Sequence, residues 1–303
     1  DYKLKQSTNN GRVFEFVGAG NGDYSALRKL PSPQKSQVFS TSAEYTFNKG
    51  KIGGDFSLSH YDVNLFSSKN NDQNTGFAGR IFGNKIFTKN NWNGTIGAEF
   101  QRISSQFHIL DRINDVEFSR DFNLTQEFNQ ITQNRLIFSF LNQWKNNNFI
   151  NYKLNYLNEK QSYNGIKNDL DFKFLKKNTE TRVNVSYLNT TSDFQDTQFA
   201  RGNVSTEFLG KKGSWSFGGS FEHNLKNFNQ TKTLDVTSFS WKEVFVQKRI
   251  GDSLRTKLLA KSYFRTNDSV RDNSLKKMNN ILGLMLESQL IRTEKKQLST
   301  SVH

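Results

Sequence analysis

Four charged residues stand at alternate positions in one short stretch: Lys167, Asp169, Asp171 and Lys173. Paired carboxylates can perform general acid and base catalysis when a fold brings them together. In an extended strand, however, residues two apart point to the same side. The four side chains would then share one face, where opposite charges pair across strands. We expect them to line a polar interior, with catalysis as the alternative interpretation.

Other motifs that could support chemistry are incomplete. Gly18, Gly20 and Gly22 follow a short apolar stretch, as in a phosphate-binding loop, but no amphipathic helix follows them. The four histidines have no partner at a metal-ligand spacing, and the acidic stretches lack the spacing of a calcium loop. No Gly-x-Ser-x-Gly or His-Glu-x-x-His pattern is present. We therefore expect no enzyme activity, no cofactor and no metal.

The segments that would position these residues alternate in hydrophobicity with a period of two. In residues 150–156 the even positions are apolar and the odd positions are Asn or Lys, and similar alternation recurs at 39–47, 52–59, 166–174 and 183–187. Strict alternation predicts strands with one apolar face and one wet face. We expect about 14 strands after residue 36, most of roughly 9–12 residues, which exceeds the ~5–6 of soluble strands and matches the ~9–11 of membrane-spanning strands.

The connections between these strands alternate in length. Short turns are expected near residues 48–50, 88–91, 145–148, 176–179, 210–213 and 249–252. Longer polar loops are expected between them, near residues 61–75, 104–133, 190–197, 223–232 and 265–276. Outer-membrane barrels have short periplasmic turns and longer extracellular loops. The alternation therefore favours an antiparallel up-and-down transmembrane β-barrel with its two kinds of connection at opposite ends.

The two faces of the expected sheet supply two sets of candidate residues. The polar face would line the lumen with Asp55, Lys153, Lys167, Asp169, Asp171, Lys173, Arg182, Arg255 and Lys257. Aromatic residues beside short turns would form the girdle found where an apolar band meets lipid headgroups, and these are Phe47, Phe87, Trp92, Trp144, Phe149, Phe174, Phe208 and Trp215. The alternative is that aromatic residues simply favour strands.

Composition agrees with an ordered but polar sheet protein. Only 34% of the 303 residues are hydrophobic and the mean hydropathy is −0.73, yet 14% are aromatic, which argues against disorder. The absence of cysteine excludes disulfides and thiolate sites. The net charge of +14 suggests a polyanionic partner such as anionic lipid. We expect no nucleic-acid partner, because the basic residues lie mostly at turns and on polar faces.

Two regions are expected along the chain. Residues 1–35 form a lead-in segment with one short strand and a turn rich in Gly and Pro, and residues 36–303 form the barrel region. The final alternating stretch, residues 297–303, is too short for a full span of ~9–11 residues. We therefore expect the chain to be part of a larger barrel.

Three stretches resemble successive segments of a group of large outer-membrane proteins of the Bacteroidota that have no assigned activity. They are "FVGAGNGDYSALRKLPSPQ", "FSLSHYDVNLFSSKNNDQNTGFAGR" and "RINDVEFSRDFNL", and the resemblance is clearest over residues 12–124. It implies an outer-membrane location and a longer parent protein with a signal peptide. It implies no catalytic residues.

These observations predict an outer-membrane β-barrel with a polar, charged lumen that acts in transport, secretion or surface attachment. Its partners would be membrane lipid and proteins of the periplasm or cell surface. The alternative is a soluble, secreted or periplasmic β-sheet binding module that packs its apolar face on itself.

Overall fold

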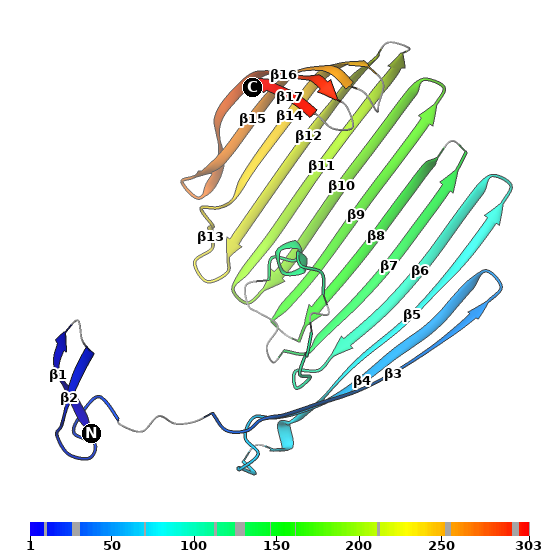
Figure 1. The fold of residues 1–303 in the computed structure, drawn as a ribbon. Coiled ribbons are helices and arrows are strands. Elements are labelled where there is room, and N and C mark those ends of the chain that lie inside the picture. The colour runs from blue at the N-terminus through cyan, green and yellow to red at the C-terminus, as the bar shows by residue number, and fades with distance from the viewer. Residues whose placement is uncertain are drawn as a thin grey trace.

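The computed structural model describes residues 1–8, 11–25, 31–69, 71–111, 114–124, 131–145, 147–160, 162–210, 213–251, 256–292 and 297–302, without the side chains of 8, 256, 257 and 289–302. Almost all regular structure in these residues is β-strand (Figure 1). The helical elements are one short 3₁₀ turn, η1 (Asn71–Gln73), and one short helix, α1 (Phe118–Asp121). No helix in the described residues is long and apolar enough to cross a membrane.

The main sheet has 15 strands and is antiparallel throughout. Each strand pairs with the next along the chain, except that β13 attaches beside β12. The strands are β3 (Lys35–Phe47), β4 (Gly50–Asp62), β5 (Thr75–Lys89), β6 (Trp92–Ile103), β7 (Gln133–Trp144), β8 (Asn148–Glu159), β9 (Tyr163–Lys176), β10 (Thr179–Ser192), β11 (Gln195–Gly210), β12 (Gly213–Phe228), β13 (Thr233–Leu234), β14 (Phe239–Gly251), β15 (Thr256–Arg271), β16 (Ser274–Arg292) and β17 (Gln297–Val302). The expected all-β, up-and-down sheet of about 14 strands is confirmed.

The strands are longer than the sequence suggested. From β3 to β16 all except β13 contain 12 to 19 residues. Two expected long loops, near 190–197 and 265–276, are instead short turns, because β10 continues to Ser192 and β15 to Arg271. Hydrophobic alternation fades where both faces become polar, while the backbone ladder continues through pairs such as Thr190 with Thr197.

Successive connections lie at opposite ends of the sheet, as the antiparallel order requires. We call the end with residues 48–49, 90–91 and 177–178 the turn end, and the end with 63–74, 104–132 and 229–238 the loop end. At the turn end, Lys49, Asn90, Asn147 and Lys177 have φ between 53° and 70°, the left-handed conformation that tight hairpins need. The longest connections therefore lie together at one end, as expected, although that end also has two-residue turns at 193–194 and 272–273.

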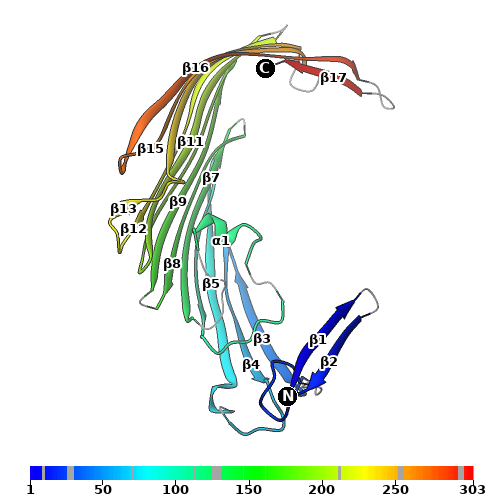
Figure 2. The same ribbon diagram turned by 90° about the vertical axis from the view of Figure 1, so that its left-hand side faces the viewer.

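The sheet is curved and open. Figure 2 shows it bending so that α1 lies on its concave side. Among the described strands β3 pairs only with β4, and β17 only with β16, so the two ends of the sheet do not meet. The structure therefore shows a curved sheet and not a closed barrel.

The lead-in segment contains two strands rather than the one expected. β1 (Tyr2–Thr8) and β2 (Gly11–Phe16) form a separate hairpin. The glycine-rich stretch closes this unit, because the Asp1 amino group donates hydrogen bonds to the carbonyl oxygens of Gly22 and Tyr24. The glycines thus form a tight turn against the hairpin, with Gly18 and Gly20 at positive φ.

Candidate functional site

The polar side chains of the main sheet gather on one face. Residues directly opposite each other in an antiparallel pair lie on the same side of the sheet. This face can be followed from β4 to β9 through residues that lie directly opposite each other: Asp55–Arg80, Arg80–Gln101, Gln101–Arg135, Arg135–Leu157 and Leu157–Gly165. We call it the polar face.

Seven of the predicted lumen-lining residues lie on the polar face. They are Asp55, Lys153, Lys167, Asp169, Asp171, Lys173 and Arg182. Arg255 lies outside the described residues, as does the side chain of Lys257, which belongs to β15. The polar face is also the concave one, because α1 contacts it through Lys167 and lies on the concave side of the sheet.

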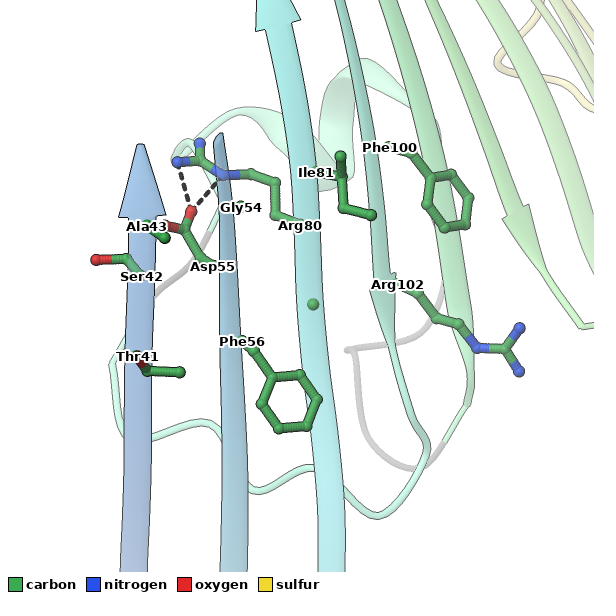
Figure 3. A pocket seen from close by; sticks show the side chains of 11 residues that line it. Thr41, Ser42, Ala43, Gly54, Asp55, Phe56, Arg80, Ile81, Phe100 and Arg102 are labelled. Atoms are coloured by element: carbon green, nitrogen blue, oxygen red, sulfur yellow. Dashed lines mark hydrogen bonds and ion pairs between the residues drawn. The ribbon is translucent and has the colours of Figure 1, made fainter. Parts of the chain in front are cut away.

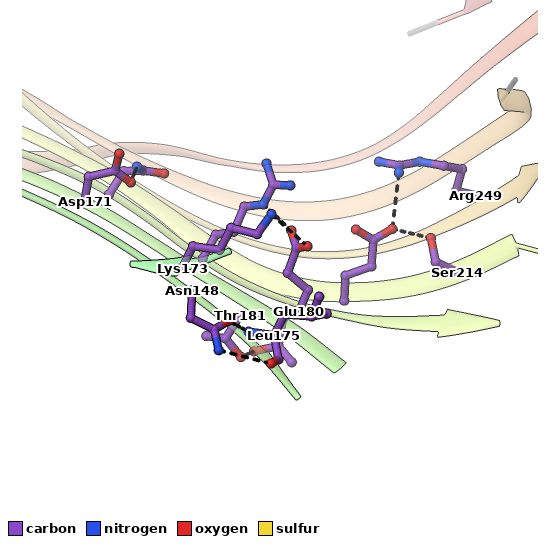
Figure 4. Close-up of polar contacts among 12 residues, drawn as sticks. Asn148, Asp171, Lys173, Leu175, Glu180, Thr181, Ser214 and Arg249 are labelled. Atoms are coloured by element: carbon purple, nitrogen blue, oxygen red, sulfur yellow. Dashed lines mark hydrogen bonds and ion pairs between the residues drawn. The ribbon is translucent and has the colours of Figure 1, made fainter. Parts of the chain in front are cut away.

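Opposite charges on the polar face form ion pairs, some between strands and one within a strand. Asp55 accepts from Arg80 with a closest distance of 2.6 Å, and Lys173 Nζ lies 3.3 Å from Glu180 Oε2. Glu180 also binds Arg182, and Arg249 Nη1 lies 3.3 Å from Glu207 Oε1 (Figure 4). Two of the residues predicted from the sequence, Asp55 and Lys173, therefore pair with an opposite charge on the neighbouring strand, as expected for a lined polar surface, and Arg182 pairs within its own strand.

The most enclosed carboxylate of this face is Glu243 in β14. Its side chain is only 4% exposed and accepts from Lys261 Nζ at 2.6 Å and Arg265 Nη2 at 2.7 Å. Arg265 also lies over the Trp241 ring, 4.6 Å from its centroid. Glu243 was not among the residues predicted from the sequence, because nothing in the local pattern shows which cations lie across the strand pair.

Replacing Glu243 with Gln should lower the free energy of unfolding by about 2 kcal/mol, because it leaves two half-buried cations without their carboxylate. The measurement is denaturant unfolding of the purified protein. Glu44→Gln is the matched control, since Glu44 also binds a lysine, Lys51 at 2.9 Å, but its side chain is 44% exposed. That change should cost under ~1 kcal/mol, and equal losses would contradict the importance of the Glu243 pairs.

The opposite face, here called the apolar face, is hydrophobic and uncovered. Tyr45, Ile81 and Leu282 are 68%, 65% and 81% exposed, and most of the exposed large hydrophobic side chains in the sheet lie on this side. The charged residues of this face lie towards the strand ends. Examples are Lys85, Arg102, Lys176, Asp196, Lys242 and Lys248. An uncharged band therefore crosses the middle of the described strands.

Glycines hollow part of this apolar face near β4 and β5. Gly54 and Gly79 leave a depression of about 390 Å³ that is bordered by Phe56, Ile81 and Phe100 (Figure 3). The Asp55–Arg80 ion pair drawn in Figure 3 belongs to the other face. The depression is thus a mainly apolar surface feature with one cation, Arg102, at its border.

Seven of the eight predicted girdle residues lie on the apolar face near the turn end. They are Phe47, Phe87, Trp92, Trp144, Phe174, Phe208 and Trp215. Some contact one another, such as Trp92 and Trp144, whose rings stack with centroids 5.3 Å apart. They form a row of aromatic side chains along the turn end.

Phe149 departs from this row and lies on the polar face, opposite Lys173. The reason is the register of the hairpin: Trp144 pairs with Asn148, so the next residue points to the other side. Proximity to a short turn, on which the prediction for Phe149 rests, does not determine which face of the sheet a residue lies on.

The connection between β6 and β7 folds back over the polar face. We call residues 104–111 and 114–124 the inward segment. His108 stacks on Tyr61 with ring centroids 3.8 Å apart, and its backbone N–H donates to Ser59 Oγ at 2.9 Å. The backbone of Phe107 passes so close to Gly76 that a Cβ there would lie 2.1 Å from the Phe107 nitrogen. A glycine is therefore needed where the segment crosses β5.

Further along, the inward segment forms the buried hydrophobic cluster of the sheet. Phe118 and Phe122 pack with Leu157, Tyr163 and Leu188, which are 1 to 6% exposed. The Tyr163 hydroxyl donates to the Phe122 carbonyl at 2.6 Å. Three apolar side chains interrupt the polar face near the loop end, and α1 packs against them: Leu157, Tyr163 and Leu188.

Polar contacts hold the same segment across β9 and β11. Lys167 Nζ lies 2.7 Å from Asp121 Oδ2, and Asn123 Nδ2 donates to Thr197 Oγ1 at 2.8 Å. Gln195 continues this network to Asp235, whose pKa is lowered chiefly by a hydrogen bond from the Thr237 backbone N–H. Lys167, expected to line an open lumen, is therefore paired with the segment that covers it.

From the sequence, residues 104–133 are expected only to form a long polar loop. The signal for its inward course was present in Phe118 and Phe122, two aromatic residues four positions apart in a polar stretch. That spacing places both on one side of a helical turn. Their partners, by contrast, come from three strands distant in sequence.

Among the described residues, no group of three or more His, Cys, Asp or Glu side chains could hold a metal ion. Comparison with models of known protein families found no match, and comparison with curated proteins found none either.

Proposed function

We propose that this chain forms part of an outer-membrane β-barrel whose apolar face contacts lipid and whose polar face lines a lumen. The single observation that carries the proposal is the contrast between the two faces. One face exposes a charge-free band of Phe, Ile, Leu and Val, and the other bears paired charges and a folded-over segment. Soluble proteins rarely expose apolar patches larger than a few hundred Å².

Further features support the same proposal. The strands are long enough to cross an apolar core of ~30 Å, since each residue advances a strand by about 3.3 Å. Aromatic residues line the turn end, and the longest connections lie at the opposite end. Barrels of the outer membrane combine these features with the long loops outside the cell. The proposed role is passage or attachment of polar molecules at the cell surface, with lipid as the surrounding partner.

The alternative, a soluble binding module, requires a second layer on the apolar face. Among the described residues, the only buried hydrophobic cluster lies on the polar face, around Phe118 and Phe122. The apolar face has no such cover there. This observation favours lipid over self-packing.

Cysteine labelling of intact cells tests the proposal, because the 303 residues contain no cysteine of their own. Asp193→Cys at the loop end should react with a membrane-impermeant maleimide on intact cells. Lys177→Cys at the turn end should react only after the outer membrane is permeabilised. The two positions are matched, since both lie in two-residue turns between long strands.

Equal labelling of both positions on intact cells, or recovery of the protein in the soluble fraction, would contradict the membrane proposal. The reverse pattern, in which only Lys177→Cys is labelled on intact cells, would support a membrane location with the turn end facing outward.

A further inference from the structure

A pocket lies between the inward segment and the polar face near the loop end. Its volume is about 410 Å³, within the range of small-ligand pockets. Arg120, Asp121 and Asn123 cover it, and Leu188, Phe199 and Phe239 contribute apolar surface. The cover is fixed to the sheet by the Lys167–Asp121 ion pair and by Asn123, so the pocket is held by contacts on both sides.

The charges of this pocket leave two cations for a ligand. Lys167 is paired with Asp121, and Arg120 Nη1 lies 2.9 Å from Glu117 Oε2. Arg201 and Lys226 also line the pocket, and within the described part of the chain neither lies within 4.0 Å of a carboxylate oxygen, while the charge of Lys226 helps to lower the pKa of Asp235. Arg201 lies beside the Phe199 ring, 5.7 Å from its centroid. An anionic group would complete the pairing of these two side chains.

Two side chains of the pocket, Asn224 and Glu222, offer oxygen atoms that could accept hydrogen bonds from a ligand. Asn224 Oδ1 is buried and has no partner in the described structure. A buried acceptor left unpaired costs about 1–3 kcal/mol, which a ligand donor would recover. Glu222 also lines the pocket and accepts from Trp241 Nε1 through Oε2 at 3.1 Å, and a carboxylate has a second acceptor oxygen, Oε1. Hydroxyl groups are donors that would suit both oxygens.

The pocket therefore combines two unpaired cations, acceptors for hydroxyl groups and two phenyl rings. A sugar ring that carries an acidic group has the matching features: an anion, several hydroxyls and an apolar C–H face. Resting on the proposed function of the polar face as a lumen, we propose that the pocket beneath α1 binds a small acidic sugar. Its carboxylate or phosphate would contact Arg201 and Lys226, and its hydroxyls would contact Asn224 and Glu222.

Isothermal titration calorimetry of the full protein in detergent tests this site. Glucuronate and glucose 6-phosphate are the two anionic probes, and glucose is the neutral one. We expect at least one anionic probe to bind at least tenfold more tightly than glucose. The probe that binds better identifies carboxylate or phosphate as the preferred anion.

Arg201→Gln should weaken binding of that probe at least tenfold, and Lys226→Gln should weaken it in the same direction. Lys153→Gln is the matched control, because Lys153 is also a polar-face cation but lies outside the pocket. The affinity of this variant for the probe should equal that of the unchanged protein. Because two pocket variants are measured, the proposal can still be tested if one of them fails to fold.

Binding of neither anion, glucose binding as tightly as the anions, or equal effects of Arg201→Gln and Lys153→Gln would overturn the proposal. The experiment is independent of membrane location. Symmetric cysteine labelling with intact sugar binding would refute the lumen alone, and the opposite pair of results would refute the pocket alone.

Discussion

If the apolar face contacts lipid as proposed, arginine in place of Leu154 should lower the free energy of unfolding in lipid vesicles by about 2–4 kcal/mol, because a charge would enter the middle of that face. Leu154 lies near the centre of β8 on the apolar face, opposite Phe138 and Asn168. The measurement is reversible denaturant unfolding of the full protein in phosphatidylcholine vesicles. The cost arises from desolvation of the guanidinium and not from a lost packing contact alone.

Asn151→Arg is the matched control in the same strand. Asn151 is exposed on the polar face and lies directly opposite Asp171, so the new charge meets water and a carboxylate. Its effect should stay within about 1 kcal/mol. Equal losses for the two arginines would remove the distinction between a lipid face and a lumen face.

Asn155 shows why the structure is needed to choose such a control. By alternation it belongs with Asn151 on the polar face, and the pairing confirms that side. Yet Asn155 is only 4% exposed and accepts from Arg135 Nη2 at 3.3 Å, beneath the inward segment. A substitution there would disturb packed structure, so its cost would not report on the lumen.

The sequence determined the strand faces well because a period of two is a local property. Lys167, Asp169, Asp171 and Lys173 share a face for the same reason that Leu170 and Phe172 share the other. The turn end was also predictable, since Lys49, Asn90 and Lys177 stand in short polar breaks between long alternating stretches. Antiparallel order then follows from short connections between adjacent strands.

What the sequence could not supply depends on contacts between distant residues. The pairing of Lys167 with Asp121 joins positions 46 apart, and the seat of Phe118 uses side chains from β8, β9 and β10. Phe149 shows the same limit at short range, because one residue of hairpin register decides its face. The pocket beneath α1 follows from these contacts and has no signature in any single stretch.

The second large effect concerns closure of the sheet. Residues 1–303 expressed alone with an export signal should not insert as a stable barrel, because β3 and β17 each leave one edge unpaired in the described structure. β3 alone contains 13 residues, and roughly half of the backbone N–H and C=O groups of an edge strand point away from its partner. In lipid each unpaired group costs several kcal/mol, so an inserted open edge would be penalised by tens of kcal/mol.

The expected product is protease-sensitive and shows no difference in gel migration between heated and unheated samples. The same assay on protein isolated from outer membranes is the control and should show a compact unheated form. A compact, heat-sensitive species from the 303 residues alone would contradict the prediction, because it would mean that β3 and β17 can meet. If the sheet closes through further strands, the polar face would form part of the lumen wall and the inward segment would lie against it inside the barrel.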